Sequence, residues 1–136
     1  MNVLRTRSAG RAVERLDRQV RRRYDSAVQE LRGRGCAAGG YRLLGETGES
    51  YPLCCRYFYG QWRMHLAFPD PGTVVIISIA KHTTHSNPHE LLAEVFPGLS
   101  ATGRRRSAKP PCCEDNGAPP QMSDHARAIL ETAFAL

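Results

Sequence analysis

Basic and histidine side chains gather between residues 56 and 89 of this 136-residue sequence. In chain order they are Arg56, Arg63, His65, Lys81, His82, His85 and His89. Histidine can give or take a proton near neutral pH, because its unperturbed pKa is about 6.5. Arginine and lysine stabilise negative charge that develops on a phosphate. Together they suit metal-independent RNA cleavage, in which a 2′-hydroxyl loses a proton and attacks the adjacent phosphate, while the departing 5′-oxygen gains one.

A β-hairpin over residues 53–68 is predicted to hold the first of these groups. Two aromatic-rich runs, 53–59 and 62–68, flank a Gly-Gln turn, and residues that pair directly across such a hairpin point to the same face. One face is then expected to carry Arg56, Phe58, Arg63 and His65. The other face would pack on helices through Tyr57, Tyr59, Trp62 and Met64. On the first face, an aromatic ring such as that of Phe58 can stack an unpaired base.

A strand buried on both faces is predicted for residues 73–80, whose sequence TVVIISIA is apolar and mostly β-branched. It delivers three more side chains to the end of the sheet: Lys81, His82 and His85. Asn87 has the features of an N-cap for a short helix over residues 89–96. We therefore expect one concave, positive surface formed by Arg56, Arg63, His65, Lys81, His82 and His85.

The remaining pattern predicts an α+β fold. Residues 2–6 and 41–44 read as short strands, and residues 8–34 read as a helical hairpin with an apolar stripe on one side. The hairpin would pack on a small antiparallel sheet of about four to five strands, with an extra C-terminal helix. The chain divides into a domain over 1–99, a flexible linker over 100–122 that contains three consecutive arginines, and a helix over 123–136.

The formal net charge is +6, and its distribution is uneven. Residues 1–34 hold ten arginines against four carboxylates, so the remainder of the chain is balanced. A basic lobe of this kind favours a polyanion or an acidic protein as partner, and the run Arg21, Arg22 and Arg23 is its densest part. The alternative is that arginine outnumbers lysine because the genome is GC-rich, and that the helices simply have solvated faces.

A metal site is not expected from the sequence. The pairs Cys54-Cys55 and Cys112-Cys113 lack the C-x₂-C spacing of structural zinc sites, and neighbouring cysteines in a strand point to opposite faces. Cys55 is expected in the core and Cys54 on the surface. The three histidines with ligand-like spacing, His82, His85 and His89, have no carboxylate beside them.

The cysteines and the N-terminus favour a reducing compartment. Five cysteines leave at least one thiol outside any internal disulfide framework, and the first residues lack the apolar run of a signal peptide. The sequence contains no run of eighteen apolar residues, so no membrane span is predicted. We therefore expect a cytoplasmic protein with no membrane partner.

The central third of the sequence resembles the RelE/ParE superfamily of bacterial toxins. The run Trp62-Arg63-Met64-His65-Leu66, a Pro-Gly turn and the Val/Ile-rich strand ending in Lys81-His82 are similar to the core of that family. The arginine-rich helical hairpin before it and the short helix after it also fit. Thr84-His85-Ser86-Asn87 is similar to the Thr-His-Ser-Asp stretch of the YafQ branch. The resemblance covers roughly residues 2–98.

The resemblance implies a RelE-like fold and ribosome-dependent cleavage of mRNA in the A site, with a cognate antitoxin as partner and no cofactor. It implies phosphate stabilisation by Arg63, acid–base catalysis by His85 and further catalytic roles for His82 and Arg56. From the residue pattern and the resemblance together, we expect RNA to be bound by Lys81, His65, Phe58, His89, Arg21, Arg22 and Arg23. The family's base-stacking aromatic near the C-terminus has no clear match. Two alternatives stay open: inhibition of DNA gyrase, as in the ParE branch, and a catalytically inert relative that only binds a partner.

Overall fold

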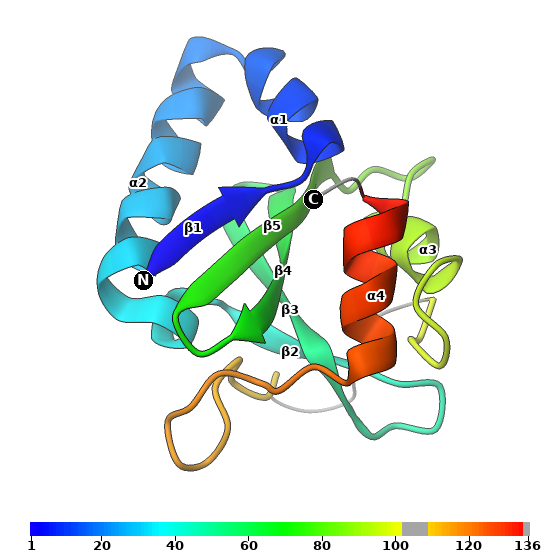
Figure 1. Ribbon diagram of the computed structural model, residues 1–136. Coiled ribbons are helices and arrows are strands. Elements are labelled where there is room, and N and C mark those ends of the chain that lie inside the picture. The colour runs from blue at the N-terminus through cyan, green and yellow to red at the C-terminus, as the bar shows by residue number, and fades with distance from the viewer. Residues whose placement is uncertain (102–108, 135–136) are drawn as a thin grey trace.

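The computed structural model describes residues 1–101 and 109–134, which form an α+β fold with one mixed sheet between two layers of helices (Figure 1). The strands are β1 (Asn2–Arg5), β2 (Tyr41–Leu44), β3 (Ser50–Tyr59), β4 (Trp62–Asp70) and β5 (Thr73–Lys81). The helices are α1 (Arg7–Glu14), α2 (Arg18–Arg34), α3 (Pro88–Ala93) and α4 (Asp124–Ala133), with a short 3₁₀ turn, η1, at Gly35–Ala38. The coarse α+β prediction is confirmed.

The five strands follow the order β1-β5-β4-β3-β2. The pairs β2–β3, β3–β4 and β4–β5 are antiparallel, but β1 runs parallel to β5. The prediction of a wholly antiparallel sheet is therefore wrong at this edge. The physical reason is that β1 leads into helices instead of a tight turn, and a long connection allows a parallel neighbour.

Each face of the sheet has its own apolar core. On one side α1 and α2 cover a cluster that includes Tyr24 and Leu31, and on the other α3 and α4 cover one that includes Leu92 and Leu130. Strand β5 contributes to both clusters, with Val74 and Ile76 on the first side and Val75 and Ile77 on the second. These four side chains are fully buried, which confirms the prediction of a strand buried on both faces.

The β3–β4 hairpin has the predicted turn but not the predicted register. Tyr59 pairs with Trp62 as expected. A bulge at Phe58 then shifts the strands by one residue, so that Tyr57 and not Phe58 lies opposite Arg63. A bulged residue is left out of the ladder, and every position beyond it changes face.

The shift separates side chains that the sequence placed together. Cys55 now pairs with His65, and these two share a face with Arg63. Arg56 and Phe58 lie on the opposite face, toward α2, so the prediction that all four polar-face residues lie together is wrong. Arg63 and His65 do share a face as predicted.

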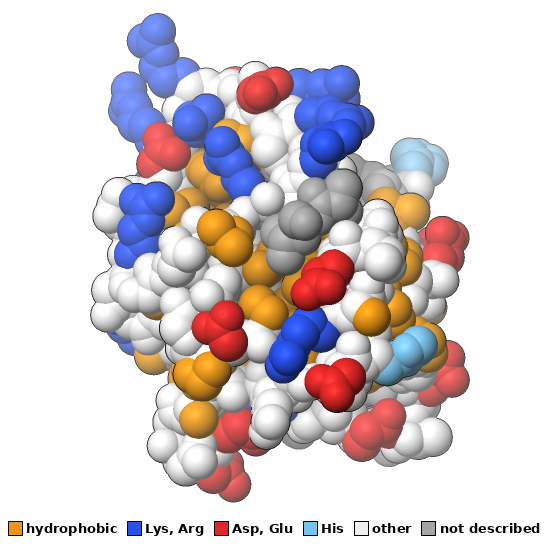
Figure 2. Space-filling model, in the orientation of Figure 1, with side chains coloured by type: hydrophobic (Ala, Val, Ile, Leu, Met, Phe, Trp, Pro, Cys, Tyr) orange, Lys and Arg blue, Asp and Glu red, His pale blue; other side chains and the backbone are white. Residues whose placement is uncertain are grey.

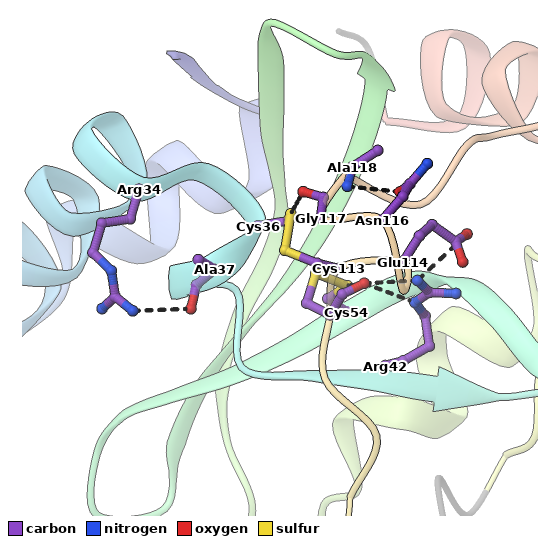
Figure 3. Close-up of a disulfide and its surroundings, with 11 residues drawn as sticks. Arg34, Cys36, Ala37, Arg42, Cys54, Cys113, Glu114, Asn116, Gly117 and Ala118 are labelled. Atoms are coloured by element: carbon purple, nitrogen blue, oxygen red, sulfur yellow. Dashed lines mark hydrogen bonds and ion pairs between the residues drawn. A yellow bond between two sulfur atoms is a disulfide. The ribbon is translucent and has the colours of Figure 1, made fainter.

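Two disulfides join the C-terminal segment to the body of the protein (Figure 3). Cys36 bonds to Cys113 with 5.2 Å between the Cα atoms, and Cys54 bonds to Cys112 with 5.6 Å. Cys54 is fully buried, so its predicted surface position is wrong. Cys55 is buried as predicted and lies outside both disulfides.

The described part of the segment predicted as a linker is bound closely to the sheet. The Arg42 guanidinium donates two hydrogen bonds, of 3.0 and 2.7 Å, to the Cys112 carbonyl oxygen, and Tyr41 forms a bridge with Pro111. The arginine run predicted in this linker falls within 102–108, outside the described residues. Helix α4 follows, capped by the Ser123 hydroxyl as predicted. Within the described ranges, no helix is long and apolar enough to cross a membrane.

Candidate functional site

A buried arginine lies where β4 and β5 meet the start of α3. The Arg63 side chain is 2% exposed. One terminal nitrogen lies 3.0 Å from His82 Nδ1, and the other lies 3.3 Å from His89 Nε2. Its guanidinium carbon lies 4.2 Å from the centroid of the Tyr57 ring. Among the described residues no carboxylate forms an ion pair with Arg63, and its buried Nε has no hydrogen-bond partner.

The contacts of Arg63 fix the protons on a chain of neighbouring side chains. A guanidinium only donates hydrogen bonds, so His89 Nε2 must accept and the proton of neutral His89 lies on Nδ1. That proton is donated to His65 Nε2, 3.1 Å away. His65 therefore carries its own proton on Nδ1, which donates to Ser78 Oγ at 2.9 Å. The chain is fully satisfied with both histidines neutral.

His65 is held neutral by its surroundings. It is fully buried, and burial lowers the pKa of its imidazole well below the usual value, with further lowering by His89 and Arg63. Desolvation and neighbouring positive charge both disfavour the protonated ring. His65 is thus suited to orienting His89 and not to exchanging protons with a substrate.

Cys55 and Tyr41 line the same part of the sheet. Cys55 lies opposite both Tyr41 on β2 and His65 on β4. Burial raises the pKa of the Tyr41 hydroxyl, and charge and hydrogen bonding from Cys55 raise it further. One ligand atom from each of Cys55, His65 and His89 lies within 4.8 Å of those of the other two.

A cavity of about 510 Å³ opens beside this cluster, lined by Arg34, Tyr41, Cys55, Arg56, Tyr57 and Lys109 among others. The Lys109 ammonium lies 4.4 Å from the Tyr41 ring centroid and 4.8 Å from that of Tyr57. Tyr57 is 37% exposed, and both the Lys109 ammonium and the Arg63 guanidinium lie over its ring. The exposed part of the ring, with the cationic groups beside it, can contact a base and its phosphate.

A second hollow, of about 550 Å³, lies on the other side of the molecule between β1 and α2. Its lining includes Arg5, Arg21, Arg32 and Asp25, but no histidine. It therefore offers charge without a group that titrates near neutral pH. We place the candidate site at Arg63 instead.

The structure brings four of the predicted site residues together: Arg63, His65, His82 and His89. Arg56 and Phe58 are not among them. Arg56 donates to the Ala38 carbonyl oxygen at 2.8 Å and forms a 2.6 Å ion pair with Glu30. The Phe58 ring packs between Tyr24 and Trp62, so both side chains have structural partners on the α2 side.

The other predicted residues lie farther out. Lys81 ends β5 and is exposed, and His85 lies exposed in the Thr83–Ser86 turn that follows. The three consecutive arginines of α2 lie on the layer across the sheet from Arg63: Arg21, Arg22 and Arg23. Figure 2 shows lysine and arginine side chains gathered over the α1 and α2 side. Within that patch Arg21 pairs with Asp25, and Arg23 lies over the Tyr59 ring.

Sequence reasoning missed Tyr57, Cys55 and Lys109 as members of the site. Tyr57 and Cys55 face the site because of the bulge at Phe58, and no residue type in the sequence predicts that bulge. Lys109 lies within the predicted linker, and its position depends on the disulfides that return the chain to the sheet.

Comparison with known protein families, curated proteins and solved structures gave no significant match.

Proposed function

We propose that this protein is an RNA-cleaving toxin of the RelE/ParE type, acting as a metal-independent endoribonuclease on mRNA in the ribosomal A site. The observation that carries the proposal is the buried Arg63 guanidinium, which contacts two imidazoles and has no carboxylate partner among the described residues. A buried charge without a counter-ion is unfavourable. An RNA phosphate would supply that counter-ion.

The proposed reaction uses Arg63 and the exposed groups around it. A histidine base removes the proton of the 2′-hydroxyl, whose oxygen then attacks phosphorus. Arg63 stabilises the additional negative charge of the phosphorane. The bond to the 5′-oxygen breaks, and a histidine acid protonates that oxygen. The products are a 2′,3′-cyclic phosphate and a 5′-hydroxyl.

His82 is the best-placed acid or base, because it is partly exposed and its Nδ1 accepts from Arg63. Neutral His82 therefore carries its proton on Nε2. His85 is the second candidate, from the adjacent exposed turn. Tyr57 takes the base-stacking role first expected of Phe58, while Lys81 and Lys109 would hold RNA. The basic layer of α1 and α2 suits a cognate antitoxin with acidic character.

Cleavage mapping tests this proposal. Purified protein is added to translating ribosomes with a defined mRNA, and the cut ends are located by primer extension. We expect cuts within A-site codons, with Arg63→Ala and His82→Ala each slowing cleavage by about 10²–10³-fold. The control is Arg11→Ala, which removes an exposed arginine on α1 and should leave the rate unchanged.

An uncut message from folded protein would overturn the nuclease proposal. The gyrase alternative would then be examined by DNA supercoiling, with the same variants. Absence of both activities would leave the third reading, a RelE-like fold that only binds a partner.

A further inference from the structure

One sulfur and two imidazole ligand groups meet in the interior beside Arg63. Cys55 comes from β3, His65 from β4 and His89 from the first turn of α3. The first two are fully buried, and His89 is 3% exposed. One ligand atom from each lies within 4.8 Å of the others. Sulfur and imidazole nitrogen are the donors that zinc prefers, whereas calcium and magnesium require oxygen.

The spacing of the two imidazoles also fits a metal ion. His65 Nε2 and His89 Nδ1 are 3.1 Å apart. Two nitrogens at 2.0–2.1 Å from a tetrahedral zinc ion are separated by about 3.3 Å. The distance between the two nitrogens in the hydrogen bond is thus close to the distance between two ligands on one ion. Each ring would turn so that its lone pair points at the ion and not at the other nitrogen.

The neighbours of the cluster provide outer-sphere support. A metal-bound histidine usually donates its second N–H to a fixed acceptor, which orients the ring. His65 Nδ1 already lies 2.9 Å from Ser78 Oγ. Tyr41, which lies directly opposite Cys55 on β2, can donate to the Cys55 thiolate.

We propose that Cys55, His65 and His89 form a binding site for a zinc-class transition-metal ion. On binding, the Cys55 thiol releases its proton to solvent and the sulfur coordinates the ion. His65 binds through Nε2, which already lacks a proton. His89 moves its proton from Nδ1 to Nε2 and binds through Nδ1. This inference goes beyond the proposed nuclease function and does not depend on it.

Arg63 gives this site a second state. While His89 Nε2 accepts from Arg63, at 3.3 Å, His89 Nδ1 must keep its proton and cannot bind the ion. Once the ion is bound, Nε2 carries the proton and repels the guanidinium. Metal and Arg63 therefore compete for His89, and metal binding releases one Arg63 nitrogen toward an external anion.

Titration with Co²⁺, and with Zn²⁺ in competition, tests the site in the full-length oxidised protein after dialysis against a chelator. Cys55 is the one cysteine outside the two disulfides. A sulfur-to-cobalt charge-transfer band therefore reports Cys55 alone. With a solvent molecule as the fourth ligand, we expect one ion per chain, a tetrahedral cobalt spectrum and complete displacement by Zn²⁺.

Variants separate this site from adventitious binding. His65→Gln and His89→Gln should weaken Co²⁺ binding at least tenfold, and Cys55→Ser should abolish the charge-transfer band. His125→Gln, at an exposed position on α4, should leave binding unchanged. Arg63→Gln should tighten binding several-fold, because it removes the competing donor and a nearby positive charge.

The wild-type titration alone can overturn the proposal, even where a variant fails to fold. Absence of the charge-transfer band with folded wild-type protein would exclude the site. Tight binding that survives both histidine changes would place the ion elsewhere. Because neither readout involves RNA, a negative result here is distinct from failure of the nuclease proposal.

Discussion

The side chain of Arg63 combines two features that are seldom found together. It is almost completely buried, yet its contacts are with neutral acceptors and an aromatic ring instead of a carboxylate. Removing a charge from water costs several kcal/mol unless it is paired. A bound anion would supply the missing counter-ion. This is the residue-level reason to place phosphate chemistry here.

His65 should make the stability of the protein depend on pH. Its pKa is lowered in the folded state, so below about pH 6.5 the unfolded chain binds a proton that the folded chain does not. Stability is therefore complete above the unfolded pKa and decreases as pH falls, by up to about 1.4 kcal/mol per pH unit for this one group. Urea unfolding between pH 7.5 and 5.5, with chelator present, measures the slope.

The pH dependence of the unfolding free energy in the parent protein is compared with that of two variants. His65→Gln should flatten the pH dependence of the unfolding free energy. His125→Gln, on the exposed side of α4, should preserve it. An unchanged slope in His65→Gln would show that His65 is not held neutral in the fold.

At the scale of elements, the positions of β3 and β4 decide which residues form the site. The sequence predicted both strands, their turn and the buried strand β5, because alternation, aromatic content and turn residues are local signals. It did not predict the bulge at Phe58, because a bulge is set by packing across strands and not by one residue type. Because of this one inserted residue, Tyr57 occupies the position opposite Arg63 that was expected for Phe58, and Arg56 faces away from the site.

Contacts between segments that are far apart in the sequence were also not predictable. Four cysteines on three segments allow several pairings, and the pattern of types does not choose among them. The parallel placement of β1 beside β5 is likewise a choice between distant segments. Helix starts were predictable at Asn87 and Ser123, where the cap acts within three residues.

Gly40 controls the start of β2 and thereby the position of Tyr41. Its φ is 76°, and an added methyl group would overlap the backbone of Cys55 and Arg56. Gly40→Ala should therefore lower the free energy of unfolding by about 2–4 kcal/mol. Gly33→Ala is the matched control, since nothing lies within 4 Å of its added methyl. In helix α2 it should stabilise by about 0.5–1 kcal/mol.

Chemical denaturation of the two glycine variants under the same conditions gives both values. Equal stability of Gly40→Ala and the parent protein would mean that the β2–β3 edge adjusts easily. In that case, the close packing beside Cys55 would be less rigid than the structure indicates.

At the scale of the whole molecule, the two disulfides attach the C-terminal third to the rest. They span sequence separations of 58 and 77 residues, and Cys112 belongs to the core on the α1–α2 side. The same segment leads to α4, which covers the opposite face. The disulfides therefore connect both layers, and they fit an oxidising environment better than the reducing one predicted from the cysteine count.

Reduction should lower stability without abolishing the fold. Each disulfide typically contributes about 2–4 kcal/mol, mainly by restricting the unfolded chain. Because the second crosslink closes a smaller additional loop, the loss of stability on reducing both disulfides should be less than the sum of the two separate losses. Urea unfolding with and without dithiothreitol measures it, and the double variant Cys54→Ser/Cys112→Ser isolates one bond.

The stability of the reduced protein also distinguishes a reducing from an oxidising compartment. A domain of this size commonly has a free energy of unfolding of about 5–15 kcal/mol. If the oxidised protein lies in the upper part of that range, the chain stays folded after its disulfides are reduced. If the fold and A-site cleavage persist in dithiothreitol, the protein can act on cytoplasmic ribosomes, with the disulfides as added stabilisation. If reduction unfolds the chain, a reducing cytoplasm cannot be its working environment. The ribosomal target would then have to be abandoned, since Arg63 and its histidines are assembled only in the folded sheet.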